Sequence, residues 1–160
     1  MQIWYDFIKI WHNFKHGIIN LIKWFPIIWM DRNWDYQYFY KIMQKKLKGM
    51  ENLHRFHGHH IGDIDTANTM KTCITLIEQL MEDNYNNICF NNYYDKWGRP
   101  YYIDENHKFG MREKKILNKE DKIQKQKEFK ICLNKENELK LKDKEQLFKI
   151  ITDNIDSWWD

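Results

Sequence analysis

Apolar side chains recur every three or four residues along most of this chain, and this spacing restricts what it can fold into. The clearest run begins near the N-terminus and comprises Ile3, Trp4, Phe7, Ile8, Trp11, Phe14, Ile18, Leu21 and Ile22. Such spacing places the apolar side chains on one face of an α-helix. The sequence contains no Val, which weakens any sheet-based alternative. We therefore expect an all-α fold.

Two further helices are expected after a turn. Pro26 disfavours helical geometry at Phe25 and should end or kink the first helix. Asp31 or Asn33 then offers an N-cap for a helix that runs from about residue 34 to His57. Gly58 and Gly62 bracket the next break, and Asp63 or Asp65 can cap the third helix. Its expected inner face consists of Met70, Cys73, Ile74, Ile77, Leu80 and Met81.

The second half of the chain is less regular. Residues 84–111 show no helical period and are rich in aromatic residues, which predicts one long ordered loop with room for a short hairpin. Residues 112–142 read as a solvated, Lys-rich helix that breaks near Leu139. A last helix follows, and its Trp158 and Trp159 must dock on something. The expectation is one domain, residues 1–160, built as a bundle of about five helices.

Length and charge exclude several classes of protein. A chain of 160 residues suits one domain. Its net charge of +3 is small, with 13 basic and 12 acidic side chains in residues 1–111, so nucleic-acid binding is not favoured. The three cysteines have no paired spacing, which suits a reducing cytosol. Charged residues interrupt the apolar N-terminal run, so we expect neither a membrane span nor a signal peptide.

One turn combines the side chains that suit an anionic ring compound. Trp29, Arg32, Trp34 and Asp35 lie close together in the sequence, where a helix is expected to begin. An arginine fork suits phosphate, and a Trp can stack on a base. With His60 as a further companion, these residues form the candidate ligand site. The alternative is structural: Asp31 caps the helix, Asp35 pairs with Arg32, and the tryptophans belong to the core.

A histidine cluster is the densest set of metal-ligand side chains. If His54 and His57 share a helical face, a metal ion could bind there with His59 and Asp63. The spacing is not a recognised zinc signature, and histidines at a helix end often cap carbonyls instead. The carboxylates of Glu78, Glu82 and Asp83 could serve acid or base chemistry with a histidine. No familiar catalytic motif is present, so no cofactor is expected.

The motif around Pro26 resembles that of a group of small uncharacterised proteins of tailed bacteriophages. The similarity lies in Trp24-Phe25-Pro26-Ile27-Ile28-Trp29, followed by Asp31-Arg32-Asn33-Trp34-Asp35, and in the closing Trp158-Trp159-Asp160. Asn33 stands where the group often has Asp. The resemblance implies a phage product in the host cytoplasm and implies no established activity.

Three functions from different classes follow. The first is a non-enzymatic counter-defence protein that sequesters a nucleotide-like immune signal at the Arg32 turn. The second is a protein-interaction module that inhibits a host protein or forms a homo-oligomer through the aromatic first helix and the C-terminal tryptophans. The third is a metal-dependent hydrolase that uses the histidine cluster.

Overall fold

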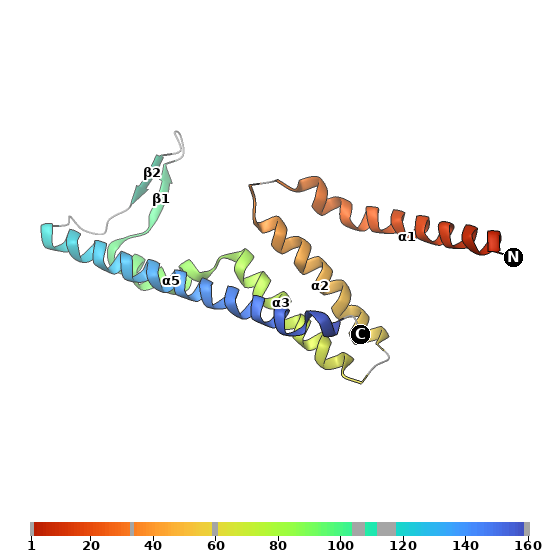
Figure 1. Cartoon of the computed structure of the whole chain (residues 1–160). Coiled ribbons are helices and arrows are strands. Elements are labelled where there is room, and N and C mark those ends of the chain that lie inside the picture. Colours follow the sequence, from red (N-terminus) through yellow and green to blue (C-terminus); the bar gives the residue numbers. More distant parts are fainter. Residues whose placement is uncertain (1, 33, 59–60, 104–107, 112–117, 159–160) are drawn as a thin grey trace.

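The chain folds as an all-α bundle, as expected. The computed structural model describes residues 2–32, 34–58, 61–103, 108–111 and 118–158. Its five α-helices are α1 (Gln2–Met30), α2 (Gln37–His57), α3 (Asp63–Glu82), α4 (Tyr85–Trp97) and α5 (Lys119–Asn154) (Figure 1). A 3₁₀ turn, η1 (Ile155–Trp158), follows α5 directly, and the strands β1 (Pro100–Ile103) and β2 (Lys108–Met111) form a small hairpin.

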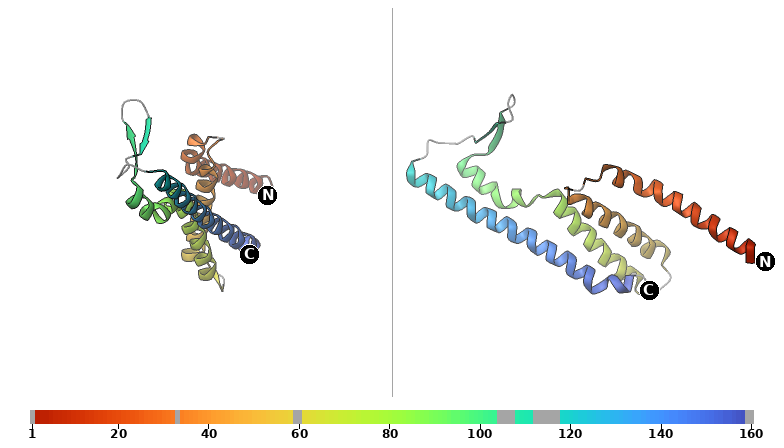
Figure 2. Two further views of the ribbon diagram at one scale, coloured as in Figure 1. Left: turned by 90° about the vertical axis from the view of Figure 1, so that its left-hand side faces the viewer. Right: turned by 45° about the horizontal axis from the view of Figure 1, so that its top comes forward.

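The main core lies where α2, α3 and the C-terminal half of α5 pack together, whereas α1 projects away from them (Figure 2). The expected inner face of α3 is confirmed, with Met81 partly buried at its edge. The C-terminal end also docks as expected, because Trp158 packs into this core, while Trp159 lies outside the described residues. The buried residues of the core are Tyr40, Leu47, Met50, Met70, Cys73, Ile74, Leu76, Ile77, Leu80, Tyr85, Leu147 and Trp158.

The expected break near Leu139 is wrong, because α5 is continuous from Lys119 to Asn154. No Gly or Pro interrupts these residues, so nothing local ends the helix. Leu139 itself packs against both the main core and a second cluster around α4. The sparse apolar positions of α5 are therefore sufficient to pack a continuous helix, since different stretches of α5 pack against different partners.

The expected loop over residues 84–111 is also wrong in its first half, which forms α4. Tyr85, Cys89, Phe90, Tyr93 and Trp97 are buried at helical spacing. Several asparagines lie between them, and their low helix propensity hides the period in the sequence. The hairpin that was expected as an option does form, with Tyr101 opposite Gly110 and Tyr102 opposite Phe109.

Glu128 ties α4 to α5 through charged hydrogen bonds. Trp97 Nε1 donates to Glu128 Oε2 at 2.6 Å, and Lys96 Nζ donates to Oε1 at 2.6 Å. Gln124 Nε2 adds a third bond from within α5, at 2.8 Å. These donors stabilise the carboxylate and lower the pKa of Glu128 to about 2. The side chain is therefore ionised at neutral pH and orients the Trp97 indole.

Pro26 does not end the first helix, contrary to expectation. The helix continues through Pro26 to Met30, and the turn comes afterwards, at residues 31–36. The carbonyl of Ile22 loses its helical donor, yet Ile22 is exposed, so that water can reach this part of the helix. The N-cap of α2 also differs from both expected residues, because it is Tyr36, which makes no side-chain cap bond. Asp35, one residue earlier, accepts from the backbone N–H of Gln37 through Oδ1 at 2.9 Å. Asn33 lies outside the described residues.

The break between α2 and α3 is bracketed by Gly58 and Gly62, as expected, and α2 ends at His57. Gly62 has a positive φ of 102° and precedes α3, so Asp63 and Asp65 lie in the first turn rather than at the cap. At Gly58, a Cβ would come within 2.2 Å of Asp63 Oδ2. Gly58 is therefore needed, because the same Cβ would also come within 2.5 Å of the His54 backbone carbonyl oxygen, which cannot move aside as a side chain can.

Candidate functional site

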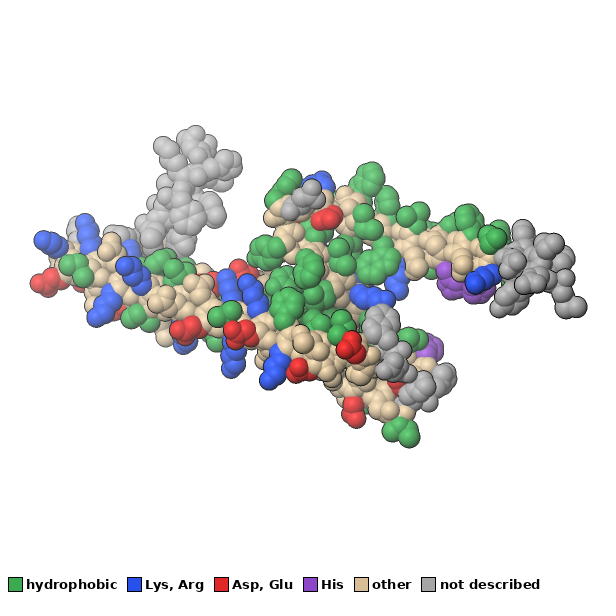
Figure 3. Space-filling model, viewed as in Figure 1, with side chains coloured by type: hydrophobic (Ala, Val, Ile, Leu, Met, Phe, Trp, Pro, Cys, Tyr) green, Lys and Arg blue, Asp and Glu red, His purple; other side chains and the backbone are tan. Residues whose placement is uncertain are grey.

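Helix α1 is amphipathic: its surface divides lengthwise into an apolar half and a polar half, which face opposite sides of the helix. Its exposed apolar side chains lie at helical spacing on one half and include Trp11, Phe14, Ile18, Ile22, Phe25 and Trp29. The other half carries Lys9, His12, Asn13, His16, Asn20 and Lys23. In Figure 3, hydrophobic side chains follow the upper edge of α1 and basic or histidine side chains its lower edge. We call the first half the apolar face of α1.

The apolar face does not contact the body of the protein. Among residues 8–30, whose side chains the structure describes, the half-buried ones are Trp24 and Ile27, and all others are exposed. By helical spacing, Trp24 follows Asn20 by one turn and Ile27 follows Lys23, so both lie on the polar half. There Lys45 Nζ of α2 donates to the Lys23 carbonyl and lies 5.6 Å from the centre of the Trp24 ring. Helix α1 therefore docks by its polar half and leaves its apolar face outward.

A second apolar surface is a groove of about 320 Å³ between α2 and the C-terminal end of the chain. Sequence reasoning missed it, because it requires α2 and η1 to lie side by side. The residues that line it are Phe39, Ile42, Met43, Lys46, Leu47, Met50, Ile151, Ile155 and Trp158.

The residues of the expected ligand site are spread over several elements. Trp29 belongs to the exposed face of α1, and Trp34 is 82% exposed in the turn that follows. Arg32 Nη1 donates to the Asp31 carbonyl at 2.8 Å, whereas Asp35 Oδ1 accepts from the backbone N–H of Gln37 at the start of α2. The backbone N–H of Asp35 donates to the Arg32 carbonyl at 2.9 Å, but among the described residues no hydrogen bond, ion pair or ring contact joins the Arg32 side chain to that of Trp29, Trp34 or Asp35. The alternative in which Asp35 pairs with Arg32 is therefore wrong, and His60 lies outside the described residues.

This exposure makes Arg32→Ala a clean test of anion binding. We expect the free energy of unfolding of the variant to stay within about 0.5 kcal/mol of that of the parent. The reason is that the described Arg32 side chain is exposed and bonds to the carbonyl of Asp31 alone. If Arg32 holds a phosphate, the variant should lose about 1.5–3 kcal/mol of nucleotide affinity. Thermal-shift titration of the parent and the variant with a panel of nucleotides measures both effects. Stabilisation of both proteins to the same degree would contradict a role for Arg32.

His54 and Asp63 are brought together, but in a structural arrangement. His54 Nδ1 lies 2.6 Å from Asp63 Oδ1, and His54 Nε2 lies 3.3 Å from the carbonyl oxygen of Trp158. Each ring nitrogen therefore faces one oxygen, and both oxygens are hydrogen-bond acceptors. His54 thereby joins α2, α3 and η1. His57 is exposed, and His59 lies outside the described residues. Within the described part of the chain, no three His, Cys, Asp or Glu residues are placed to hold a metal ion.

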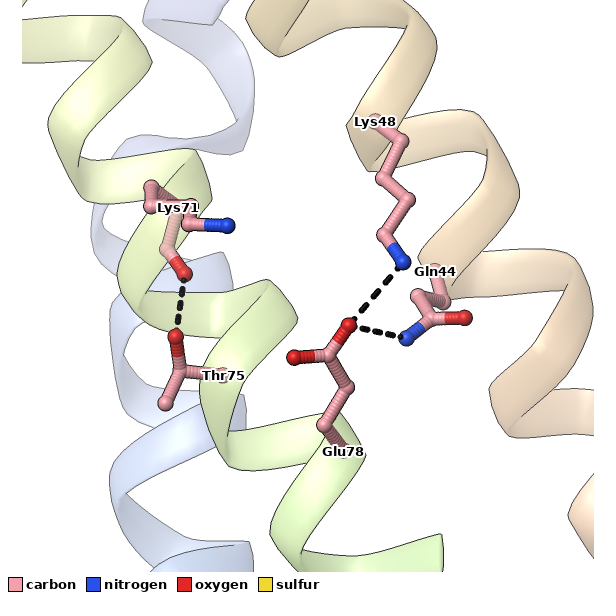
Figure 4. Close-up of polar contacts among 5 residues, drawn as sticks. All are labelled: Gln44, Lys48, Lys71, Thr75 and Glu78. Carbon is pink, nitrogen blue, oxygen red and sulfur yellow. Dashed lines mark hydrogen bonds and ion pairs between the residues drawn. The ribbon is translucent and has the colours of Figure 1, made fainter.

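Of the carboxylates considered for acid or base chemistry, Glu78 and Asp83 are engaged in contacts between elements, whereas Glu82 accepts locally from Asn84 Nδ2 at 3.2 Å. Glu78 Oε1 accepts from Gln44 Nε2 and from Lys48 Nζ, both at 2.9 Å, and so ties α3 to α2 (Figure 4). Figure 4 also shows that Thr75 Oγ1 donates within α3, to the Lys71 carbonyl. Asp83 pairs with Lys140 of α5 at 2.6 Å. No histidine contacts these carboxylates among the described residues.

Another cavity, of about 390 Å³, lies beside the start of α4 and is lined in part by Tyr85 and Asp143. Tyr85 Oη donates to Asp143 Oδ2 at 2.5 Å. Burial and the Asp143 carboxylate raise the pKa of the Tyr85 phenol well above its usual range. The phenol is therefore protonated at neutral pH and acts as a donor rather than as a base.

In the described residues, no helix is both long enough and apolar enough to cross a membrane. Comparison of the chain with protein-family models, with curated proteins and with solved structures finds no match.

Proposed function

We propose that this protein is a non-enzymatic interaction module whose binding surface is the apolar face of α1. The observation that carries this proposal is the orientation of α1, which contacts α2 through Lys23 and Trp24 on its polar half, where Trp24 and Ile27 are half-buried. An amphipathic helix that belonged to this chain's own core would bury its apolar face instead. Contiguous exposed apolar surface on a protein of this size marks a site of interaction.

The engaged carboxylates support the same conclusion. Glu78, Asp83 and Glu128 each bond to a neighbouring helix, and His54 joins three elements. These groups serve the fold and do not converge on a common cavity. The resemblance to tailed-phage proteins suggests that the module acts in the host cell, where it would occupy a host component. Sequestration of a nucleotide-like signal at Arg32 is less supported, because Trp29 and Trp34 are both exposed and the Arg32 side chain bonds to the Asp31 carbonyl.

The proposal is tested by asking whether the apolar face is covered in the cell. Phe14→Cys places a thiol on the apolar face, and Asn13→Cys places a matched control on the polar half. Cys132 is replaced by Ser in both, since it is the partly exposed native cysteine. We expect a cell-permeable maleimide to label both thiols rapidly in the purified protein, and the Cys at position 14 much more slowly in expressing cells. Equal labelling of both positions in cells would contradict the proposal.

A further inference from the structure

The apolar face of α1 has the chemistry of a helix that lies on a lipid surface. Large aromatic and aliphatic side chains cover one half, from Trp11 to Trp29, and all of those described are exposed. Lys9 and Lys23 lie on the other half together with two histidines, and Lys15 lies at the edge of the apolar half, one turn after Trp11. A lysine at such an edge can extend its ammonium group to the headgroups. A helix with this division lies parallel to a bilayer, with its apolar half among the acyl chains and its lysines among the headgroups. At 29 residues, α1 would offer about 43 Å of such contact.

The charge of α1 and α2 indicates which kind of lipid headgroup is complementary to this part of the protein. Residues 1–57, which include α1 and α2, contain nine Lys and Arg residues but four Asp and Glu residues. The remaining residues, 58–160, contain 17 basic and 19 acidic residues, so the positive charge of the chain is concentrated in the first two helices. Basic segments beside an amphipathic helix are attracted to anionic headgroups.

A second copy of the chain is less complementary to this face. In a two-fold symmetric dimer it would bring another α1 and α2, and hence the same positive charge, to the surface that it covers. An anionic bilayer instead presents apolar chains and negative charge together. We propose that the apolar face of α1 binds the surface of an anionic lipid bilayer, an inference that rests on the proposed function of this face.

The test uses the full chain with vesicles of phosphatidylcholine alone or mixed with phosphatidylglycerol. The chain should float with the mixed vesicles, float much less with the neutral ones, and dissociate as salt rises. Ile18→Glu places a charge in the middle of the apolar face, whereas Asn20→Glu adds the same charge on the polar half. We expect Ile18→Glu to weaken binding about tenfold or more, because a buried Ile is lost and a carboxylate enters the acyl region. Asn20→Glu should weaken it much less.

Three results would overturn the inference. One is that the parent floats with neither type of vesicle, and another is that Ile18→Glu floats as well as Asn20→Glu. The third is a dimer in sedimentation velocity that Ile18→Glu dissociates while vesicles bind no protein, because a second copy would then cover the face. If the Cys at position 14 is protected in cells but vesicles are not bound, the face is a binding surface and its partner is not lipid. If neither is observed, the proposed function fails as well.

Discussion

Trp158→Ala is expected to lower the free energy of unfolding by about 3–5 kcal/mol, which is the usual cost of removing a large aromatic side chain from a core. Trp158 is 5% exposed and packs with residues of α2, α3 and α5. Its carbonyl oxygen also faces His54 Nε2. The loss should therefore loosen η1 and the interhelical contacts of His54 together. Urea unfolding followed by circular dichroism measures the effect.

Trp34→Ala is the matched control, because it deletes the same atoms from a side chain that is 82% exposed. Its free energy of unfolding should stay within about 0.5 kcal/mol of the parent. Equal losses in the two variants would show that Trp158 is not part of the core.

Phe90→Ala is expected to have a loss of similar size, about 3–5 kcal/mol, but in a different part of the molecule. Phe90 is 2% exposed, and its ring centre lies 5.4 Å from that of Phe129 on α5 and 5.5 Å from that of Tyr94. Its removal should weaken the packing of α4 on the N-terminal half of α5. Hydrogen exchange should therefore accelerate in α4 and change less in α3, whose core side chains lie in the other cluster.

Phe56→Ala serves as the control for this variant, because Phe56 is an exposed Phe on α2. It should leave both stability and exchange nearly unchanged. If the amides of α4 exchange in the parent as fast as those of an unstructured loop, the helix itself is refuted and the sequence-based expectation of a loop is restored.

The contrast between α3 and α4 explains which elements could be predicted. In α3, Met70, Cys73, Ile74 and Ile77 recur at helical spacing, and Leu80 and Met81 extend the same face. In α4 the buried residues are equally regular, but asparagines fill the intervening positions and mask the pattern. The uninterrupted α5 was missed for a related reason: its buried residues are too widely spaced to form one seam, because different stretches of the helix pack against different partners.

The candidate surfaces also include features that the sequence predicts and features that it does not. The sequence predicts that α1 is amphipathic and that a C-terminal Trp must be buried. The sequence pattern of α1 does not predict which half of the helix packs against the rest of the protein. Trp24 and Ile27 were the available signal, since they are apolar residues within the polar half.

The sequence by itself determined the all-α class, the boundaries of the break between α2 and α3, and the inner face of α3, because these depend on helical periodicity and on glycine. The tertiary structure alone decided that α1 turns its apolar face outward and that α4 is a helix. It also placed the Asp63 carboxylate between His54 and Gly58. These features depend on contacts between residues far apart in the chain, and a local pattern of side chains does not specify its partner.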